Sequence, residues 1–134
     1  MRRRLPPDLE DPHAAFAATL LALGRGKDAL LASVPTTRLP GRPLAETLVA
    51  FEGSLAEAAE TMDDWHVPAV EPAWRAAAAG LAAARDLAER VRLEAVMPEG
   101  FEALVGTIGD LLAPLDAFEE AEERFRSLRR WARG

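Results

Sequence analysis

The side chains of this chain that could bind a ligand or transfer a proton are concentrated in residues 63–74. This segment contains two of the three tryptophans, one of the two histidines and three carboxylates. Imidazole and carboxylate groups bind metals and act as acids and bases, and indole rings bind apolar ligands. We therefore expect any ligand site at this pole, with Trp65, His66 and Trp74 as its candidate residues. In the alternative interpretation, the two tryptophans close the end of a helix bundle.

Two carboxylate–histidine pairs indicate how a metal would be held. Asp63 and His66 are three residues apart, as are Glu10 and His13. Ferritin-like di-metal proteins present carboxylate-x-x-His ligands on bundle helices, but near the middle of the bundle and with further carboxylates. Here both histidines lie near helix ends and the inward-facing positions are apolar. We therefore expect no metal and no cofactor.

Other catalytic motifs are not supported by their spacing. The segment Gly24-Arg25-Gly26-Lys27 lacks the spacing of a phosphate-binding loop, and Asp28 stands where that loop needs a hydroxyl. No serine has a histidine partner that the sequence identifies. Cysteine is absent, which excludes a thiol nucleophile and disulfides. We expect a protein without catalytic activity.

Length and composition favour one helical domain. The chain has 134 residues, of which 49% are hydrophobic, and its apolar residues are mostly Ala and Leu, which favour helix over strand. Residues 1–10 form a basic, proline-rich segment, and residues 11–134 are predicted to form the single domain. The absence of Asn, Gln, Cys and Tyr, with one lysine, is typical of a GC-rich bacterial genome.

The net charge and the hydropathy of the sequence limit the kinds of partner that we expect this protein to bind. The net charge of −6 argues against general attraction to nucleic acid or to an anionic membrane. The opening arginines are followed by prolines and acids rather than by the apolar run of a signal peptide, and no apolar stretch is long enough to span a membrane. We expect a cytoplasmic protein without a membrane partner.

Four segments show the spacing of amphipathic helices, separated by proline-containing breaks. They cover about residues 11–34, 44–65 and 71–93, and the region from about residue 99 onward. Short connections make consecutive helices antiparallel, so we predict an all-α, up-down-up-down four-helix bundle. The first helix is expected to continue through Gly24 and Gly26. The second has the strictest apolar period, which predicts that Phe51 and Leu55 are core residues.

The fourth helix is predicted to be longer than the other three. As a continuous helix it would measure about 50 Å against about 33–36 Å for the others, so residues from near Glu123 would project past the bundle or bend back across it. Pro114 lies inside this helix and predicts a kink near Asp110. The topology also brings the N-terminal arginines, residues 63–74 and the C-terminal arginines to one pole.

The last sixteen residues of the chain carry acidic side chains, then basic ones, beside an apolar stripe. The charges complement the helix dipole and form pairs at i,i+4, such as Glu120–Arg124 and Glu122–Arg126. An exposed stripe needs cover, either from residues 5–9 of the same chain or from a second chain, and both alternatives stay open. The candidate partner-binding residues are Arg124, Phe125, Leu128, Arg129 and Trp131.

These patterns together predict a non-catalytic interaction module that forms a homodimer or binds a protein partner through its C-terminal helix. One alternative is a metal- or small-ligand-binding bundle, or an enzyme built on such a site, that uses Glu10, His13, Asp63 and His66. A third is an arginine-mediated binder of nucleic acid or another polyanion, which the acidic net charge disfavours.

Overall fold

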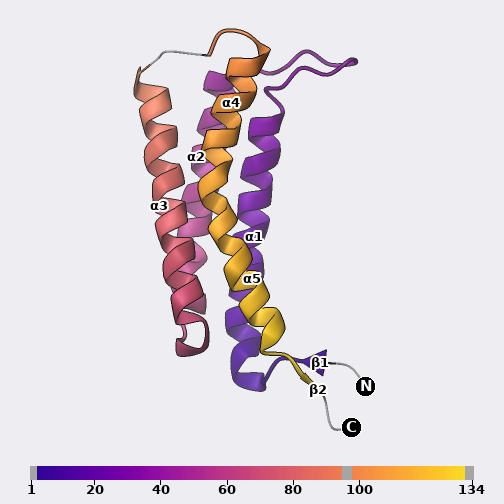
Figure 1. The fold of residues 1–134 in the computed structure, drawn as a ribbon, viewed down its shortest axis with the longest axis vertical. Coiled ribbons are helices and arrows are strands. Elements are labelled where there is room, and N and C mark those ends of the chain that lie inside the picture. The colour runs from indigo at the N-terminus through magenta and orange to yellow at the C-terminus, as the bar shows by residue number, and fades with distance from the viewer. Residues whose placement is uncertain (1–2, 95–97, 132–134) are drawn as a thin grey trace.

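The computed structural model describes residues 3–94 and 98–131, and in these residues the chain folds as four long antiparallel helices (Figure 1). The predicted all-α four-helix bundle is therefore confirmed. The helices are α1 (Glu10–Leu31), α2 (Leu44–Thr61), α3 (Glu71–Glu94) and a fourth, broken helix made of α4 (Phe101–Leu112), η4 (Ala113–Ala117) and α5 (Phe118–Ser127). None of the described helices is long and apolar enough to cross a membrane.

Short elements lie before α1, between α2 and α3, and after α5. The 3-10 turns η1 (Pro7–Leu9), η2 (Met62–Trp65) and η3 (Pro68–Val70) flank the helices, and strand β1 (Arg3–Arg4) pairs with β2 (Arg130–Trp131) in an antiparallel ladder. Both strands lie at the same end of the bundle as the connection between α2 and α3 (Figure 1). We call this the terminal end. The N-terminal arginines, residues 63–74 and the C-terminal arginines therefore share one end of the bundle, as predicted. Arg2 and Arg133 lie outside the described residues.

Helix α1 is continuous through both of its glycines, as expected. Packing explains why residue 26 is a glycine, because a Cβ at this position would lie 2.9 Å from the Cβ of Ser54 on α2. Glycine therefore lets these two helices approach closely. On α2, Phe51 and Leu55 are fully buried, which confirms the core predicted from their spacing.

The fourth helix breaks later than predicted. We expected a kink near Asp110, whereas regular α-helix continues to Leu112 and then tightens into the 3-10 turn η4. Pro114 has no N–H to donate to the carbonyl of Asp110, so the helix cannot keep its i→i−4 pattern through this position. The chain resumes as α-helix at Phe118, and the direction of the bundle is kept.

The bundle consists of two closely packed helix pairs that share one core. Helix α1 packs most closely on α2, and α3 packs on η4 and α5, whereas α1 has few contacts with the fourth helix. The shared core contains large side chains from every helix, among them Phe16, Leu48, Leu81 and Leu111. This arrangement leaves two seams between the pairs, one between α2 and α3 and one between α1 and the fourth helix.

Candidate functional site

The aromatic side chains of the terminal end form one buried cluster. The ring of Trp65 lies 4.9 Å from that of Phe16, 6.2 Å from that of Phe125 and 6.3 Å from that of Phe118. Trp65 is fully buried, and Phe125 is 1% exposed. Helices α1 and α5 and the α2–α3 connection therefore meet at this cluster, which fixes the terminal end in place.

Both tryptophans of the predicted ligand pole have hydrogen-bonded indole groups. Trp65 Nε1 donates to Thr19 Oγ1 at 3.1 Å, and Trp74 Nε1 donates to the carbonyl oxygen of Met62 at 2.8 Å. Trp65 has no ring face open to solvent. This packing agrees with the alternative interpretation, in which the two tryptophans close the end of the bundle.

His66 is held by a ring stack and a carboxylate. Its imidazole lies parallel to the indole of Trp74 with 3.6 Å between the ring centroids, and its Nε2 is 2.5 Å from Glu71 Oε2. Glu71 also accepts a hydrogen bond from Arg75 at 2.7 Å. The bond from Arg75, and to a lesser degree that from His66, lowers the pKa of the Glu71 carboxyl. These contacts link the α2–α3 connection to the first turn of α3.

The candidate metal ligands are not brought together. Within residues 3–94 and 98–131, no three histidine, aspartate or glutamate side chains form a group that could hold a metal. His66 contacts Glu71, and His13 instead packs edge-on against Phe125 with the ring centroids 5.2 Å apart. Partial burial, with the positive charge of Arg129 as a second cause, lowers the pKa of His13. The proposed set of Glu10, His13, Asp63 and His66 is therefore not a ligand cluster.

The predicted projection of the C-terminal helix is wrong. The fourth helix spans 27 residues, or about 40 Å against about 36 Å for α3. It ends at Ser127, and the chain then pairs with β1. Leu9 is buried and Leu5 packs on the core. Cover of the C-terminal stripe, by these residues or by a second chain, stays a prediction.

The partner-binding candidates therefore differ in accessibility. Phe125 lies in the core, Leu128 is half-buried against it, and the side chain of Trp131 lies outside the described part of the structure. Arg124 is exposed and donates to the carbonyl oxygen of Ala69 at 2.9 Å rather than pairing with Glu120. The predicted Glu122–Arg126 pair is present at 3.4 Å. Binding of a partner by these residues stays a prediction.

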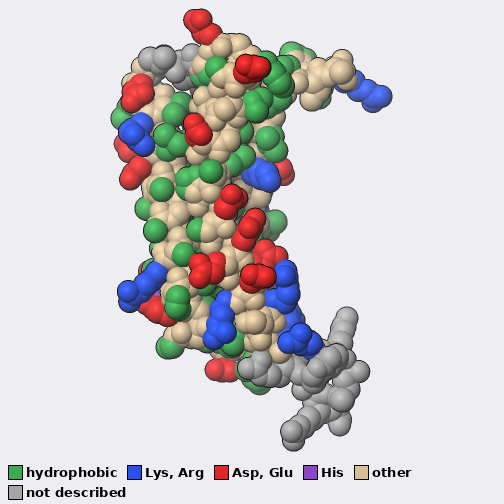
Figure 2. Space-filling model, in the orientation of Figure 1, with side chains coloured by type: hydrophobic (Ala, Val, Ile, Leu, Met, Phe, Trp, Pro, Cys, Tyr) green, Lys and Arg blue, Asp and Glu red, His purple; other side chains and the backbone are tan. Residues whose placement is uncertain are grey.

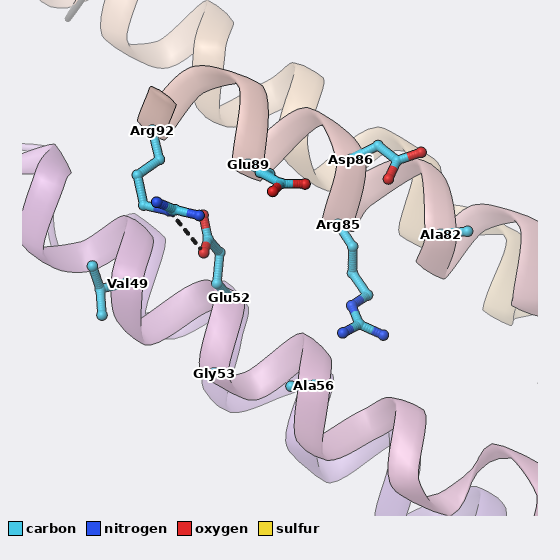
Figure 3. A pocket seen from close by; sticks show the side chains of 9 residues that line it. All are labelled: Val49, Glu52, Gly53, Ala56, Ala82, Arg85, Asp86, Glu89 and Arg92. Atoms are coloured by element: carbon cyan, nitrogen blue, oxygen red, sulfur yellow. Dashed lines mark hydrogen bonds and ion pairs between the residues drawn. The ribbon is translucent and has the colours of Figure 1, made fainter. Parts of the chain in front are cut away.

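A first groove lies between α2 and α3, with a volume of about 610 Å³ (Figure 3). Small residues, including Gly53 and Ala82, form its floor. Arg92 Nε donates to both carboxylate oxygens of Glu52 at 2.9 and 3.0 Å, which bridges one end of the groove. Arg85 extends from α3 toward α2 (Figure 3). The lining is mostly charged, unlike that of a small-molecule pocket, where apolar side chains predominate.

A second groove, which we call the α1–α5 groove, lies along the other seam and has a volume of about 210 Å³. Its apolar lining comes from both helix pairs and consists of Leu20, Leu23, Leu112, Leu115 and Phe118. Lys27 and Gly24 complete the α1 side. The rim on the fourth helix is acidic and is formed by Asp116, Glu119 and Glu122.

Two glycines and a proline explain why this groove is open. A Cβ at Gly80 would lie 2.2 Å from the carbonyl oxygen of Pro114, so only glycine allows η4 to come so close to α3. The turn η4 packs on α3 and makes few contacts with α1. On the opposite wall, a Cβ at Gly24 would meet nothing within 4 Å. The fourth helix is therefore drawn toward α3, and a missing side chain on α1 leaves the space unfilled.

The sequence contained a signal for the α1–α5 groove that reasoning from motifs did not use. Lys27 occupies a position in the apolar stripe of α1, and Gly24 lies one turn before it on the same side. A charged residue and a glycine within a core-facing stripe indicate that this part of the stripe is not fully covered. Other exposed large apolar residues, such as Leu39 and Leu93, come from separate segments, which is normal on a protein surface.

A comparison of the chain with protein-family models, with curated proteins and with solved structures finds no match. The function must therefore be argued from the chain's own geometry.

Proposed function

We propose that this protein is a non-catalytic interaction module that binds an amphipathic helical segment of a protein partner in the α1–α5 groove. The observation that carries the proposal is the row of half-buried leucines, Leu20, Leu112 and Leu115, which remains uncovered between two helix pairs. Grooves between helices commonly bind the apolar face of an added helix, whose side chains enter at positions i, i+3 and i+4.

The size of the groove favours a protein side chain over a small molecule. Its volume of about 210 Å³ is below the range of about 300–1,000 Å³ that is typical of small-molecule pockets. A bound helix inserts individual side chains, and the rest of the helix covers the surface around them. A small apolar groove is therefore sufficient to bind a helix. The larger α2–α3 groove lacks this apolar lining.

The acidic rim adds a preference for charge. Asp116, Glu119 and Glu122 border the apolar lining on one side, and Lys27 on the other is exposed. A segment with basic residues beside its apolar face would match the rim of the fourth helix, and this match would increase the rate and specificity of association more than the affinity.

A labelled amphipathic peptide of leucine and lysine, of about 15 residues so that it can form a helix, tests the proposal. Fluorescence anisotropy should show saturable binding to the intact protein. Gly24→Phe should abolish this binding, because its side chain occupies the groove without meeting another atom at Cβ. The matched control is Gly53→Phe, which fills the α2–α3 groove from an equally open glycine.

The comparison of the two variants decides the result. Peptide binding that is lost with Gly24→Phe and kept with Gly53→Phe supports the α1–α5 groove. Equal binding by both variants would show that the peptide binds elsewhere, and the proposal would then be wrong. Circular dichroism of each variant checks that the helix content is unchanged.

A further inference from the structure

The apolar lining of the α1–α5 groove continues along α4, toward the end of the bundle opposite the terminal end. Phe101, Val105, Ile108 and Leu112 are spaced by four, three and four residues, so they share one face of α4. Leu112 lines the groove, whereas Phe101 and Val105 are 58% and 44% exposed. The face of α4 that borders the groove therefore has an uncovered apolar part beyond it.

Helix α1 carries a matching row on the other side of the seam. Leu20, Gly24, Lys27 and Leu31 are also spaced by four, three and four residues. The first three line the groove, and Leu31, one turn further along, is 43% exposed. Helix α4 makes few contacts with α1, so the two rows do not close the seam between them. We call the surface formed by Leu31, Phe101 and Val105 the apolar extension of the groove.

Carboxylates are concentrated at the other end of this combined surface. Asp116, Glu119 and Glu122 form the acidic rim of the groove, and in the described residues only Glu122 of these three has an ion pair, with Arg126 at 3.4 Å. The apolar row on α4 contains no charged residue. Figure 2 shows acidic side chains gathered over η4 and α5 and hydrophobic side chains beside the upper ends of α1 and α4. The surface therefore has an acidic end and an apolar end.

We propose that the partner helix binds along both the groove and its apolar extension in one orientation. Its apolar half lies over Leu31, Phe101 and Val105, and its basic half lies over the acidic rim. The inference rests on the proposed function, because the helix occupies the same groove. Residues 101–122 of the fourth helix extend over about 30 Å, which a partner segment of about 20 helical residues would match.

The distribution of charge selects both the orientation and the kind of partner. The reverse placement would put basic side chains against apolar surface and leave the carboxylates of the rim without counter-charges, which disfavours it. The fourth helix of a second copy does not have the required chemistry. Helix α4 contains no basic residue, and the exposed side chains of α5 are all charged or polar. The occupant is therefore a helix of a separate protein.

Removal of the apolar extension tests the inference. The probe is a labelled peptide of about 20 residues with a leucine face that is flanked by serine in one half and by lysine in the other. Phe101→Ser with Val105→Ser should weaken its binding about tenfold or more in fluorescence anisotropy, because apolar contacts are lost. The matched control is Val49→Ser with Leu93→Ser, which removes two equally exposed apolar side chains outside the groove and its extension. Circular dichroism checks that each variant keeps its helix content.

Disulfide crosslinking tests the orientation, since the chain has no cysteine of its own. Under mild oxidation, Val105→Cys should crosslink to a peptide with a cysteine at its apolar end. Glu122→Cys should crosslink to a peptide with a cysteine at its basic end. The two crossed combinations should give little product, because their sulfur atoms would be too far apart to form a bond.

The outcomes separate this inference from the proposed function. If Gly24→Phe abolishes peptide binding and the change at Phe101 and Val105 does not weaken it, the groove binds a helix and the apolar extension takes no part. Equal crosslinking of each cysteine variant to both peptide ends would show that there is no fixed orientation. A wild-type dimer that Phe101→Ser with Val105→Ser dissociates would show that a second copy covers the extension. Each of these results overturns the inference, whereas binding that is insensitive to Gly24→Phe refutes the proposed function as well.

Discussion

Replacing Gly80 by alanine is expected to destabilise the fold, although the same change inside a helix ordinarily stabilises it by about 0.5–1 kcal/mol. The new Cβ would lie 2.2 Å from the carbonyl oxygen of Pro114 and 3.1 Å from the Cβ of Ala117. The first distance is far inside van der Waals contact, and the atom that must move belongs to the backbone of η4. Overpacking of this kind costs about 1–3 kcal/mol. After the ordinary gain is subtracted, the free energy of unfolding should fall by about 1 kcal/mol and by at most about 2.5 kcal/mol.

Gly53→Ala is the matched control, because Gly53 also lies inside a helix and a Cβ there meets nothing within 4 Å. It should raise the free energy of unfolding by about 0.5–1 kcal/mol. Urea denaturation followed by helical circular dichroism measures both changes, which should have opposite signs. If Gly80→Ala stabilises the protein as much as Gly53→Ala does, then η4 does not pack on α3, and our explanation of the open α1–α5 groove is refuted.

Three further predictions concern the terminal end. Phe125→Ala should lower the free energy of unfolding by about 3–5 kcal/mol, because this buried ring closes the aromatic cluster; a loss below about 1 kcal/mol would mean that the C-terminal helix is not part of the core. The pKa of His13 is lower in the folded protein than its ordinary value of 6.5, so the unfolded state binds more protons and stability falls as the pH drops below 6.5; His13→Gln should remove this part of the pH dependence, and an unchanged profile would contradict it. Protein purified without chelator should carry no stoichiometric transition metal by elemental analysis, and one metal per chain that His66→Ala removes would restore the metal-site alternative.

Helix boundaries were predictable because local chemistry fixes them. Pro43 and Pro72 lie beside the starts of α2 and α3, and Pro35 follows the end of α1, so the sequence places these ends within a few residues. The buried positions of Phe51 and Leu55 follow from a period that a helix must place on one face. Each of these predictions depends on residues close together in the chain.

The predicted projection of the C-terminal helix failed because it depended on where a helix ends without a proline or glycine signal. Nothing between Glu123 and Arg130 stops a helix, and the apolar spacing continues to Trp131. The structure ends α5 at Ser127, after which the chain pairs with Arg3 and Arg4. That pairing joins opposite ends of the sequence and involves two residues on each strand, too few for a pattern of alternation.

The candidate site was predicted only in part for the same reason. Residues 63–74 were singled out by their chemistry, yet Trp65 is in the core and His66 is tied to Glu71. The α1–α5 groove instead consists of ordinary leucines whose exposure depends on how two helix pairs fit together. Residue type indicates where a side chain could react, whereas a docking surface depends on which side chains remain uncovered after packing.

Pro114, Gly80 and Gly24 show how a small local break can produce such a surface. Pro114 interrupts the hydrogen bonding of the fourth helix, and the 3-10 turn η4 follows. This turn fits against α3 only because Gly80 has no side chain there. On α1, Gly24 has no side chain to fill the space that is left. With all three, the leucines that would otherwise close the bundle line an open groove, and the acidic start of α5 lies along its rim.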